Sequence, residues 1–297
     1  MTGQSTTSSI TRAAPARIDG GALSSGGAAL LHGTRPLKQW RWVGIFNDEL
    51  AACAALVRIG PLRQSFWALH LREEGVMRER TRMLPRRSEL ALSAGRERDE
   101  GDEVARGRLR IRDRGVELEL ELDEDEGFQA LCPNGRAQVW TRKQAGIAAR
   151  GTLRIDGGPL RPLAARAVID DTAGHHARET EWWWSAGVGR AHDGRALAWN
   201  LVSGVNDPPS GSERAVWVAG VPAEAPAVQF AADLSSVRCR DGSELRFSAE
   251  AERARRENLL ILASDYRAPF GSFSGELPGG IALAQGLGVV EHHRARW

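Results

Sequence analysis

The clearest alternation of apolar and polar positions lies at residues 116–122, which read VELELEL. Successive side chains of a strand point to opposite faces, so the apolar residues share one face and the glutamates share the other. Residues 108–112 (RLRIR) alternate in the same way, and the DRG between the two runs is typical of a turn. We therefore expect an antiparallel hairpin over residues 107–122. Burial and charge both favour the register that avoids placing Ile111 opposite Glu117.

Other runs of strand character follow along the chain and are separated by Gly, Pro, Asn and Asp. They lie at residues 40–46, 51–58, 65–70, 138–141, 152–155, 164–169, 181–188, 196–202, 214–219, 245–251, 259–263 and 281–293. Many short strands at this spacing predict an all-β protein built from sandwiches or barrels. The run EAERARRE at residues 250–257 has helical propensity, so a helix there stays an open alternative.

An internal echo suggests a duplicated β unit. A Trp-rich run begins at Trp40 and another at Trp182, and each is followed by a strand that ends in Gly, a loop and a Trp-bearing strand. Chance similarity is the alternative. We predict a disordered N-terminal arm over residues 1–30 and two lipocalin-like antiparallel barrels or sandwiches in tandem, over residues 31–150 and 151–297.

Composition narrows the functional classes. The chain has 297 residues, 40 Lys plus Arg and 38 Asp plus Glu, which gives a formal net charge of +2. A balance this close to neutral argues against nucleic acid or an anionic membrane surface as a partner. The three cysteines are far apart, and no apolar run reaches 18 residues. We therefore expect a cytoplasmic protein without disulfides or integral membrane association. The oligomeric state stays open.

The stretch from Asp170 to Trp184 looks most functional, because it combines two carboxylates, two histidines and an Arg before an aromatic strand. A carboxylate can orient a histidine, which can then move a proton near neutral pH. This makes Asp171 and His176 candidate acid–base residues. The alternative is a polar loop whose Asp and Thr side chains cap turns.

Trp182 and Trp184 share a strand face with Thr180, and such a row suits either a core or a ligand cavity. Core packing is the commoner use of any one Trp. A cavity built on this row would also take Trp199 or Trp217 as lining residues. Asn200 lies in an apolar run and needs hydrogen-bond partners if it is buried, so it is a further ligand-binding candidate.

Glu291 and His293 end an apolar row at the C-terminus. Glu291 is a third candidate catalytic residue at a barrel mouth, and the alternative is that the strand leaves the core there. The paired histidines lack the spacing of ordinary zinc ligands, so we expect no metal. The sequence contains neither a phosphate-binding Gly-rich loop nor a Gly-x-Ser-x-Gly elbow, so we expect no nucleotide cofactor.

Several long segments resemble actinobacterial members of a family catalogued as domain of unknown function 2804. They include RPLKQWRWVGIF, GPLRQSFWAL, VWTRKQAG, IDDTAGHHARET, AWNLVSGVNDPP and the terminal GVVEHHRARW. The family is in turn distantly similar to lipocalin-like two-barrel proteins such as carotenoid hydratases and some cyclases. This chain carries Glu179 where relatives carry a His, and Trp183 where they often carry a basic residue.

Three functional hypotheses follow. The first is binding of an apolar or amphipathic small molecule in a Trp-lined cavity of the second half. The second is an enzyme of hydratase, isomerase or cyclase type that acts on a lipid- or terpenoid-like alkene by acid–base catalysis. Such chemistry needs a strong acid in a dry pocket. The third is a structural or interaction module.

Overall fold

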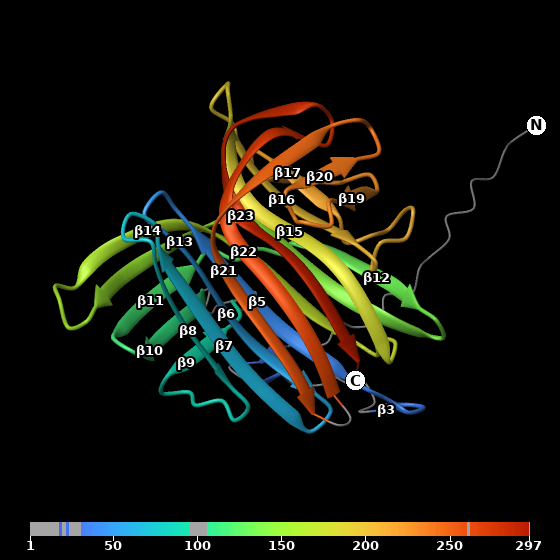
Figure 1. The fold of residues 1–297 in the computed structure, drawn as a ribbon, viewed down its shortest axis with the longest axis horizontal. Helices are drawn as coiled ribbons and strands as arrows, with labels where there is room; N and C mark the ends of the chain where they lie inside the picture. Colours follow the sequence, from blue (N-terminus) through green and yellow to red (C-terminus); the bar gives the residue numbers. More distant parts are fainter. Residues whose placement is uncertain (1–17, 20–21, 24–30, 96–105, 260–261, 297) are drawn as a thin grey trace, which may run out of the picture.

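The computed structural model describes residues 18–19, 22–23, 31–95, 106–259 and 262–296. The described residues contain no helix, so the all-β prediction is confirmed (Figure 1). The strands are β1 (Ile18–Asp19), β2 (Ala22–Leu23), β3 (Leu31–His32), β4 (Arg35–Pro36), β5 (Lys38–Phe46), β6 (Leu50–Ile59), β7 (Leu62–Leu71), β8 (Val76–Arg82), β9 (Leu90–Ser93), β10 (Gly107–Asp113), β11 (Val116–Leu122), β12 (Phe128–Asn134), β13 (Ala137–Ile155), β14 (Arg161–Gly174), β15 (Glu179–Ala191), β16 (Ala196–Ser203), β17 (Ala215–Val218), β18 (Val221–Glu224), β19 (Val228–Phe230), β20 (Ser236–Cys239), β21 (Glu244–Leu259), β22 (Leu262–Leu277) and β23 (Ile281–Arg296).

Two large antiparallel sheets repeat one topology. The first has the order β8-β7-β6-β5-β14-β13-β11-β10-β9, with β12 added beside β13, and the second has the order β18-β17-β16-β15-β23-β22-β21-β20-β19. In each sheet the first four strands, β5 to β8 or β15 to β18, lie in order from the centre to one edge. The next strand lies at the opposite edge, and the later ones approach the centre until β14 pairs with β5, or β23 with β15. The Trp-rich runs occupy β5 and β15, which are equivalent strands. This shared order supports duplication of a β unit.

The predicted hairpin is confirmed in both register and burial. Strands β10 and β11 pair antiparallel, and Ile111 lies opposite Leu118 while Arg112 lies opposite Glu117. The leucines at 118, 120 and 122 are buried, and the glutamates at 117, 119 and 121 are exposed. Alternation alone fixes this element, because a shift of one residue would expose every leucine.

The sheets change at a different place from the predicted domain boundary. Position 150 lies inside β13, a strand of 19 residues, and the chain passes to the second sheet between Gly174 and Glu179. The long strand replaces the two short ones expected at residues 138–141 and 152–155. Residues 250–257 lie in strand β21 and not in a helix, because pairing with β22 along its whole length outweighs local propensity.

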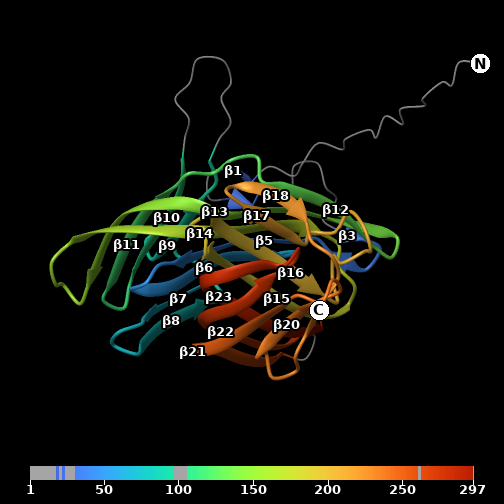
Figure 2. The same ribbon diagram turned by 90° about the horizontal axis from the view of Figure 1, so that it is seen from above.

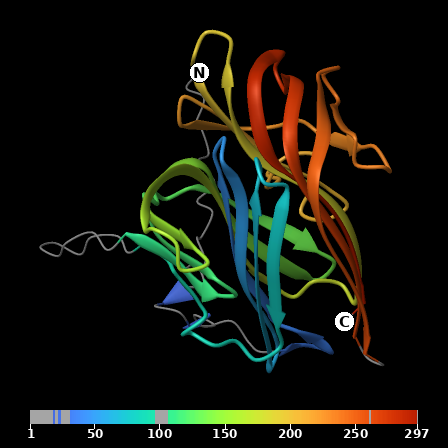
Figure 3. The ribbon, with the colours of Figure 1, turned by 60° about the vertical axis from the view of Figure 1, so that its left-hand side comes forward.

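Three apolar clusters fill the molecule. One lies inside the curl of the first sheet around Leu109 and Ile111, and another inside the curl of the second around Trp199 and Phe273. A third cluster joins residues of both sheets, including Trp184. Figures 2 and 3 show the two curled sheets side by side, with the blue strands of the first next to the red strands of the second. The region between the sheets therefore forms a core of its own.

The predicted N-terminal arm lies almost wholly outside the described residues. Its described part is a two-residue antiparallel pairing of β1 with β2, and the expectation of disorder stays a prediction. The described residues form no helix that is long and apolar enough to cross a membrane. Cys53, Cys132 and Cys239 are buried free thiols.

Candidate functional site

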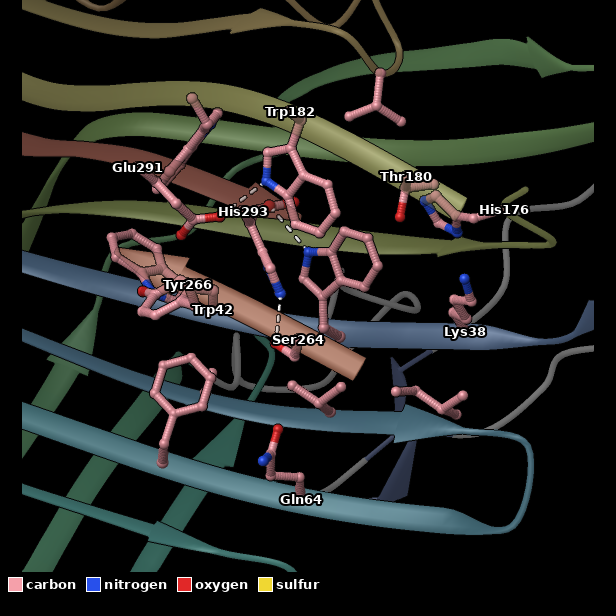
Figure 4. A pocket seen from close by; sticks show the side chains of 18 of the residues that line it. Lys38, Trp42, Gln64, His176, Thr180, Trp182, Ser264, Tyr266, Glu291 and His293 are labelled. Atoms are coloured by element: carbon pink, nitrogen blue, oxygen red, sulfur yellow. Dashed lines mark hydrogen bonds between the residues drawn. The ribbon is translucent and has the colours of Figure 1, made fainter. Parts of the chain in front are cut away.

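A pocket lies between the two sheets (Figure 4). The sequence had suggested a cavity within the second half, and this location was wrong because both sheets supply the lining residues. The pocket has a volume of about 170 Å³. Its walls come from β5, β6, β7 and β14 of the first sheet and from β15, β16, β21, β22 and β23 of the second. The deep part is aromatic, and exposed residues such as Leu62, Arg63 and Arg255 form one end. The pocket thus has a mostly aromatic and apolar wall that holds a few buried polar groups, and exposed charged residues at one end.

Four indoles form the centre of the pocket wall: Trp40, Trp42, Trp182 and Trp184. Each pair is spaced by two residues on one strand, so both rings of a pair point toward the opposite sheet. Trp42 and Trp184 meet edge to face, with ring centroids 5.0 Å apart. Equivalent strands of the duplicated unit therefore supply the equivalent pairs.

Glu291 is a carboxyl group buried in this aromatic wall. The indole N–H of Trp182 donates a hydrogen bond to its Oε1 (2.8 Å), and the Tyr266 hydroxyl also hydrogen-bonds to it. Burial raises the pKa of Glu291 to about 7, and the charge of Asp170 adds to this rise, although both hydrogen bonds oppose it. A large share of the molecules therefore hold a neutral carboxylic acid at neutral pH.

Two histidines lie in the pocket wall as neutral rings. His176 packs beside Trp40 with ring centroids 5.1 Å apart, and His293 packs beside Trp182 at 4.3 Å. His293 Nε2 is also 2.8 Å from the Ser264 hydroxyl. Burial lowers the pKa of each histidine to about 3. At neutral pH these rings can accept a hydrogen bond, but with pKa values this low they neither supply a proton nor hold one.

The neutral histidines should make the protein sensitive to acid. A histidine pKa lowered in the folded state stabilises the fold above the unfolded value of about 6.5, and this contribution is lost as the pH falls. For His293 the loss between pH 7 and pH 4 amounts to about 3 kcal/mol. We expect His293→Gln to show a correspondingly smaller loss when urea unfolding is measured at the two pH values. His192→Gln, on an exposed turn, is the matched control and should behave as wild type. An unchanged pH dependence in His293→Gln would contradict this assignment.

A chain of polar groups borders the pocket next to Trp40. The Trp40 indole N–H donates to Asp170 Oδ2 (3.0 Å), and Lys143 Nζ lies 2.5 Å from Asp170 Oδ1. Lys143 also contacts Glu213 Oε1 at 3.3 Å, and Asn206 Nδ2 donates to Glu213 Oε2 (3.0 Å). The two carboxylates raise the pKa of the buried Lys143 against the effect of burial, so this lysine stays charged.

Asp171 does not line the pocket, because it points to the opposite face of β14 from Asp170. It accepts two hydrogen bonds from Arg41 Nη1, at 2.9 and 2.8 Å, and one from Arg142 Nη2, at 2.6 Å. Glu124 contacts both arginines and completes a buried cluster of balanced charge. The loop predicted before the aromatic strand is therefore largely strand, and alternation separates its two carboxylates.

Of the other predicted residues, Trp182, Trp184, His176 and Glu291 line the pocket together. Trp199 is fully buried inside the second curl and donates to Ser185 Oγ (3.1 Å). Asn200 supports the wall from behind, since it accepts the N–H of Trp184 and donates to the Glu213 carbonyl, both at 2.8 Å.

Trp217 is buried in the cluster between the sheets and packs against Phe128, but it is not among the residues that line the pocket. Sequence reasoning missed the first-sheet wall altogether, namely Lys38, Trp40, Trp42 and Phe66, together with Tyr266 of the second sheet. The internal echo carried the signal for Trp40 and Trp42, because it aligned their strand with the strand of Trp182 and Trp184.

Comparisons with known proteins agree with this architecture. The family model described as "Domain of unknown function (DUF2804)" matches residues 76–297. No curated protein matches the sequence.

Among solved structures, a protein provisionally assigned as AttH from Nitrosomonas europaea has a TM-score of 0.55 and 14% identity, over 88% of this chain and 93% of that chain. Kievitone hydratase from Nectria haematococca has a TM-score of 0.49 and 11% identity, over 86% of this chain and 88% of that chain. At these identities the likeness to the first structure supports the fold alone.

Proposed function

This chain belongs to the family described as Domain of unknown function (DUF2804), and on that premise we propose that it binds an apolar or amphipathic small molecule between its two sheets. The observation that carries the proposal is the convergence of four indoles on one pocket. Ligand pockets are typically concave and mostly apolar, with a few placed polar groups. Glu291, Asp170 and His293 are such groups here.

The size and rim of the pocket favour a ligand with at least one apolar ring or short chain. A dry cavity of about 150 Å³ binds benzene in another protein. The volume here is about 170 Å³, and exposed charged residues such as Arg63 and Arg255 stand at one end. An amphipathic molecule would place its apolar part among the indoles and its polar part at this rim.

Glu291 favours a second candidate function, which is proton transfer to a bound alkene or related group. A carboxyl whose pKa lies near 7 in an aromatic pocket holds a proton at neutral pH and can deliver it. Neutral His176 and His293 in the same pocket can accept hydrogen bonds from a bound molecule. Of the three residues expected to do acid–base work, Glu291 has the environment of an acid, whereas Asp171 belongs to the ion cluster.

Trp182 offers the best test of binding. It is half-buried, and its ring lies against His293 and in the pocket wall. We expect Trp182→Ala to weaken binding of 2-naphthol about 10- to 100-fold, because the loss of one buried aromatic face costs about 1.5–3 kcal/mol. Titration followed by Trp fluorescence measures the affinity, and urea unfolding measures stability.

Trp140→Ala is the matched control, since Trp140 is another half-buried indole and donates to Gln129 outside the pocket. It should leave the 2-naphthol affinity unchanged. Trp184→Ala is a poorer probe, because Trp184 packs on Trp42 and its loss should destabilise the fold by about 3–5 kcal/mol. Equal affinities for Trp182→Ala and wild type would favour the core or structural-module interpretation.

A further inference from the structure

The chain uses its two kinds of basic residue in different places. It contains 38 arginines and two lysines, Lys38 and Lys143. Both lysines are almost fully buried, at 1% exposure each, although lysine is among the residues that are most rarely buried. All the other Lys or Arg positions of the chain are arginine. The two lysines are therefore confined to interior positions next to the pocket. Lys38 lies in the pocket wall, and Lys143 lies beside it, in contact with Asp170.

The two amines have different surroundings. Lys143 is held between Asp170 and Glu213 in the ion pairs described above, and these carboxylates keep it charged. Lys38 lines the pocket, and its Nζ lies 3.4 Å from the Ala177 carbonyl oxygen. Figure 4 shows the Lys38 amine at the wall beside the ring of His176, on the same side as Thr180. One lysine is thus fixed in a salt bridge, and the other faces the space where a ligand would lie.

The electrostatics of the wall favour a neutral Lys38. Burial, together with the nearby charge of Arg35 on β4, lowers its pKa to about 7. His176 from the β14–β15 connection and His293 from β23 also interact with this amine, and both are neutral rings near pH 7. Asp170, Glu213 and Glu291 are carboxyl groups that line the same pocket, and Asp170 on β14 contacts Lys143, Trp40 and Thr172.

We propose that Lys38 is a nucleophilic amine that forms an imine with the aldehyde or ketone group of an apolar molecule in the pocket. The inference rests on the proposed binding function and adds a carbonyl group to the ligand. Buried lysines that lose their charge readily are the ones that proteins use for Schiff bases. The Trp40 and Trp182 rings would hold the apolar part of the molecule.

The chemistry needs no further reactant. The lone pair of Lys38 Nζ attacks the carbonyl carbon, and the carbonyl π electrons move to oxygen, which takes up a proton to give a carbinolamine. The nitrogen then forms a double bond to the carbon and loses its remaining protons, and the oxygen leaves as water. One imine and one water form from one amine and one carbonyl compound. Water attack reverses the reaction, so the ligand is held reversibly.

The chain allows a sharp test, because Lys38 and Lys143 are its two side-chain primary amines and any adduct on an N-terminal α-amine falls in a different peptide. The protein is incubated with 2-naphthaldehyde and cyanoborohydride at pH 7, and peptide mass spectrometry locates the reduced adduct. An ordinary lysine with a pKa near 10.4 is only about 0.04% neutral at this pH. We therefore expect Lys38 to be labelled at least about tenfold faster than Lys143, with a rate midpoint near pH 7. Excess 2-naphthol, which lacks a carbonyl group, should slow the labelling of Lys38, and Lys38→Arg should abolish the adduct at this position and leave any adduct on the N-terminal amine.

The result separates this inference from the binding proposal. If 2-naphthol binds and quenches Trp fluorescence but Lys38 is not labelled, the imine inference is overturned and the binding function stands. If 2-naphthol does not bind and labelling is confined to the N-terminus, both fail. Labelling of Lys38 that 2-naphthol does not slow would place the reactive amine outside the ligand site and overturn the inference. These readings are made on wild-type protein and do not depend on the folding of a variant.

Discussion

Asp171→Asn is expected to lower the free energy of unfolding by about 3–5 kcal/mol. Asp171 is fully buried and accepts hydrogen bonds from Arg41 and Arg142, and Glu124 alone would remain to balance the two guanidinium groups. A buried charge that loses its partner cannot regain hydration without opening the structure. The cost therefore exceeds by far the value of the lost hydrogen bonds themselves.

Urea unfolding followed by far-ultraviolet circular dichroism measures the effect. The pair Arg112–Glu119 is the matched control, because both side chains are about half exposed and their nitrogen and oxygen lie 3.3 Å apart. Glu119→Gln should cost less than about 1 kcal/mol. Comparable losses in the two variants would show that the cluster around Asp171 is hydrated. The pocket affinity of folded Asp171→Asn should not change, since the side chain points away from the pocket.

Glu291→Gln is expected to abolish a pH dependence of stability. A carboxyl pKa raised from 4.5 to about 7 stabilises the fold fully below pH 4.5, and this contribution is lost as the pH rises through 7. The stability of Glu291→Gln relative to wild type should therefore rise by about 3 kcal/mol between pH 4.5 and pH 9. Urea unfolding of both proteins at several pH values measures the difference, in which the histidine contributions cancel. A difference that stays constant with pH would mean that Glu291 is solvated.

The same substitution tests the second candidate function. Glutamine keeps the shape of the acid and its contact with Trp182 but cannot release a proton. A positioned general acid typically contributes about 10²–10⁴-fold in rate, so turnover of an alkene substrate should fall by that factor. His176→Ala should have a smaller effect, because this ring is neutral and cannot act as the acid. Equal turnover by Glu291→Gln and wild type would assign the chemistry to another group.

The parts of the fold that the sequence predicted well are those with a local pattern, either alternating apolar and polar residues or a repeated Trp-rich run. The β10–β11 hairpin follows from its alternating leucines and glutamates, and the echo between the runs at Trp40 and Trp182 corresponds to equivalent strands. The length of β13 could not be predicted in this way. Its pairing with both β11 and β14 sustains it through residues that carry no strong pattern.

The site was harder to predict because it lies between sheets that are distant in sequence. We expected residues that are close in the run from Asp170 to Trp184 to act together. Consecutive side chains of a strand point to opposite faces, however, so Asp170 lies at the pocket and Asp171 lies in the ion cluster. Glu291 was found because a charged residue ended an apolar row. Lys38 was missed, since its significance depends on which face of β5 the second sheet covers.

The central claim is that the pocket between the sheets holds an apolar molecule, and native mass spectrometry of protein purified from its own host tests it most directly. Val57→Phe fills part of the pocket from a half-buried position of β6, and Val218→Phe makes the same change at a half-buried position of β17 away from it. We predict that wild type and Val218→Phe retain a bound small molecule that Val57→Phe loses. Retention of the same molecule by all three proteins, or by none, would contradict the account.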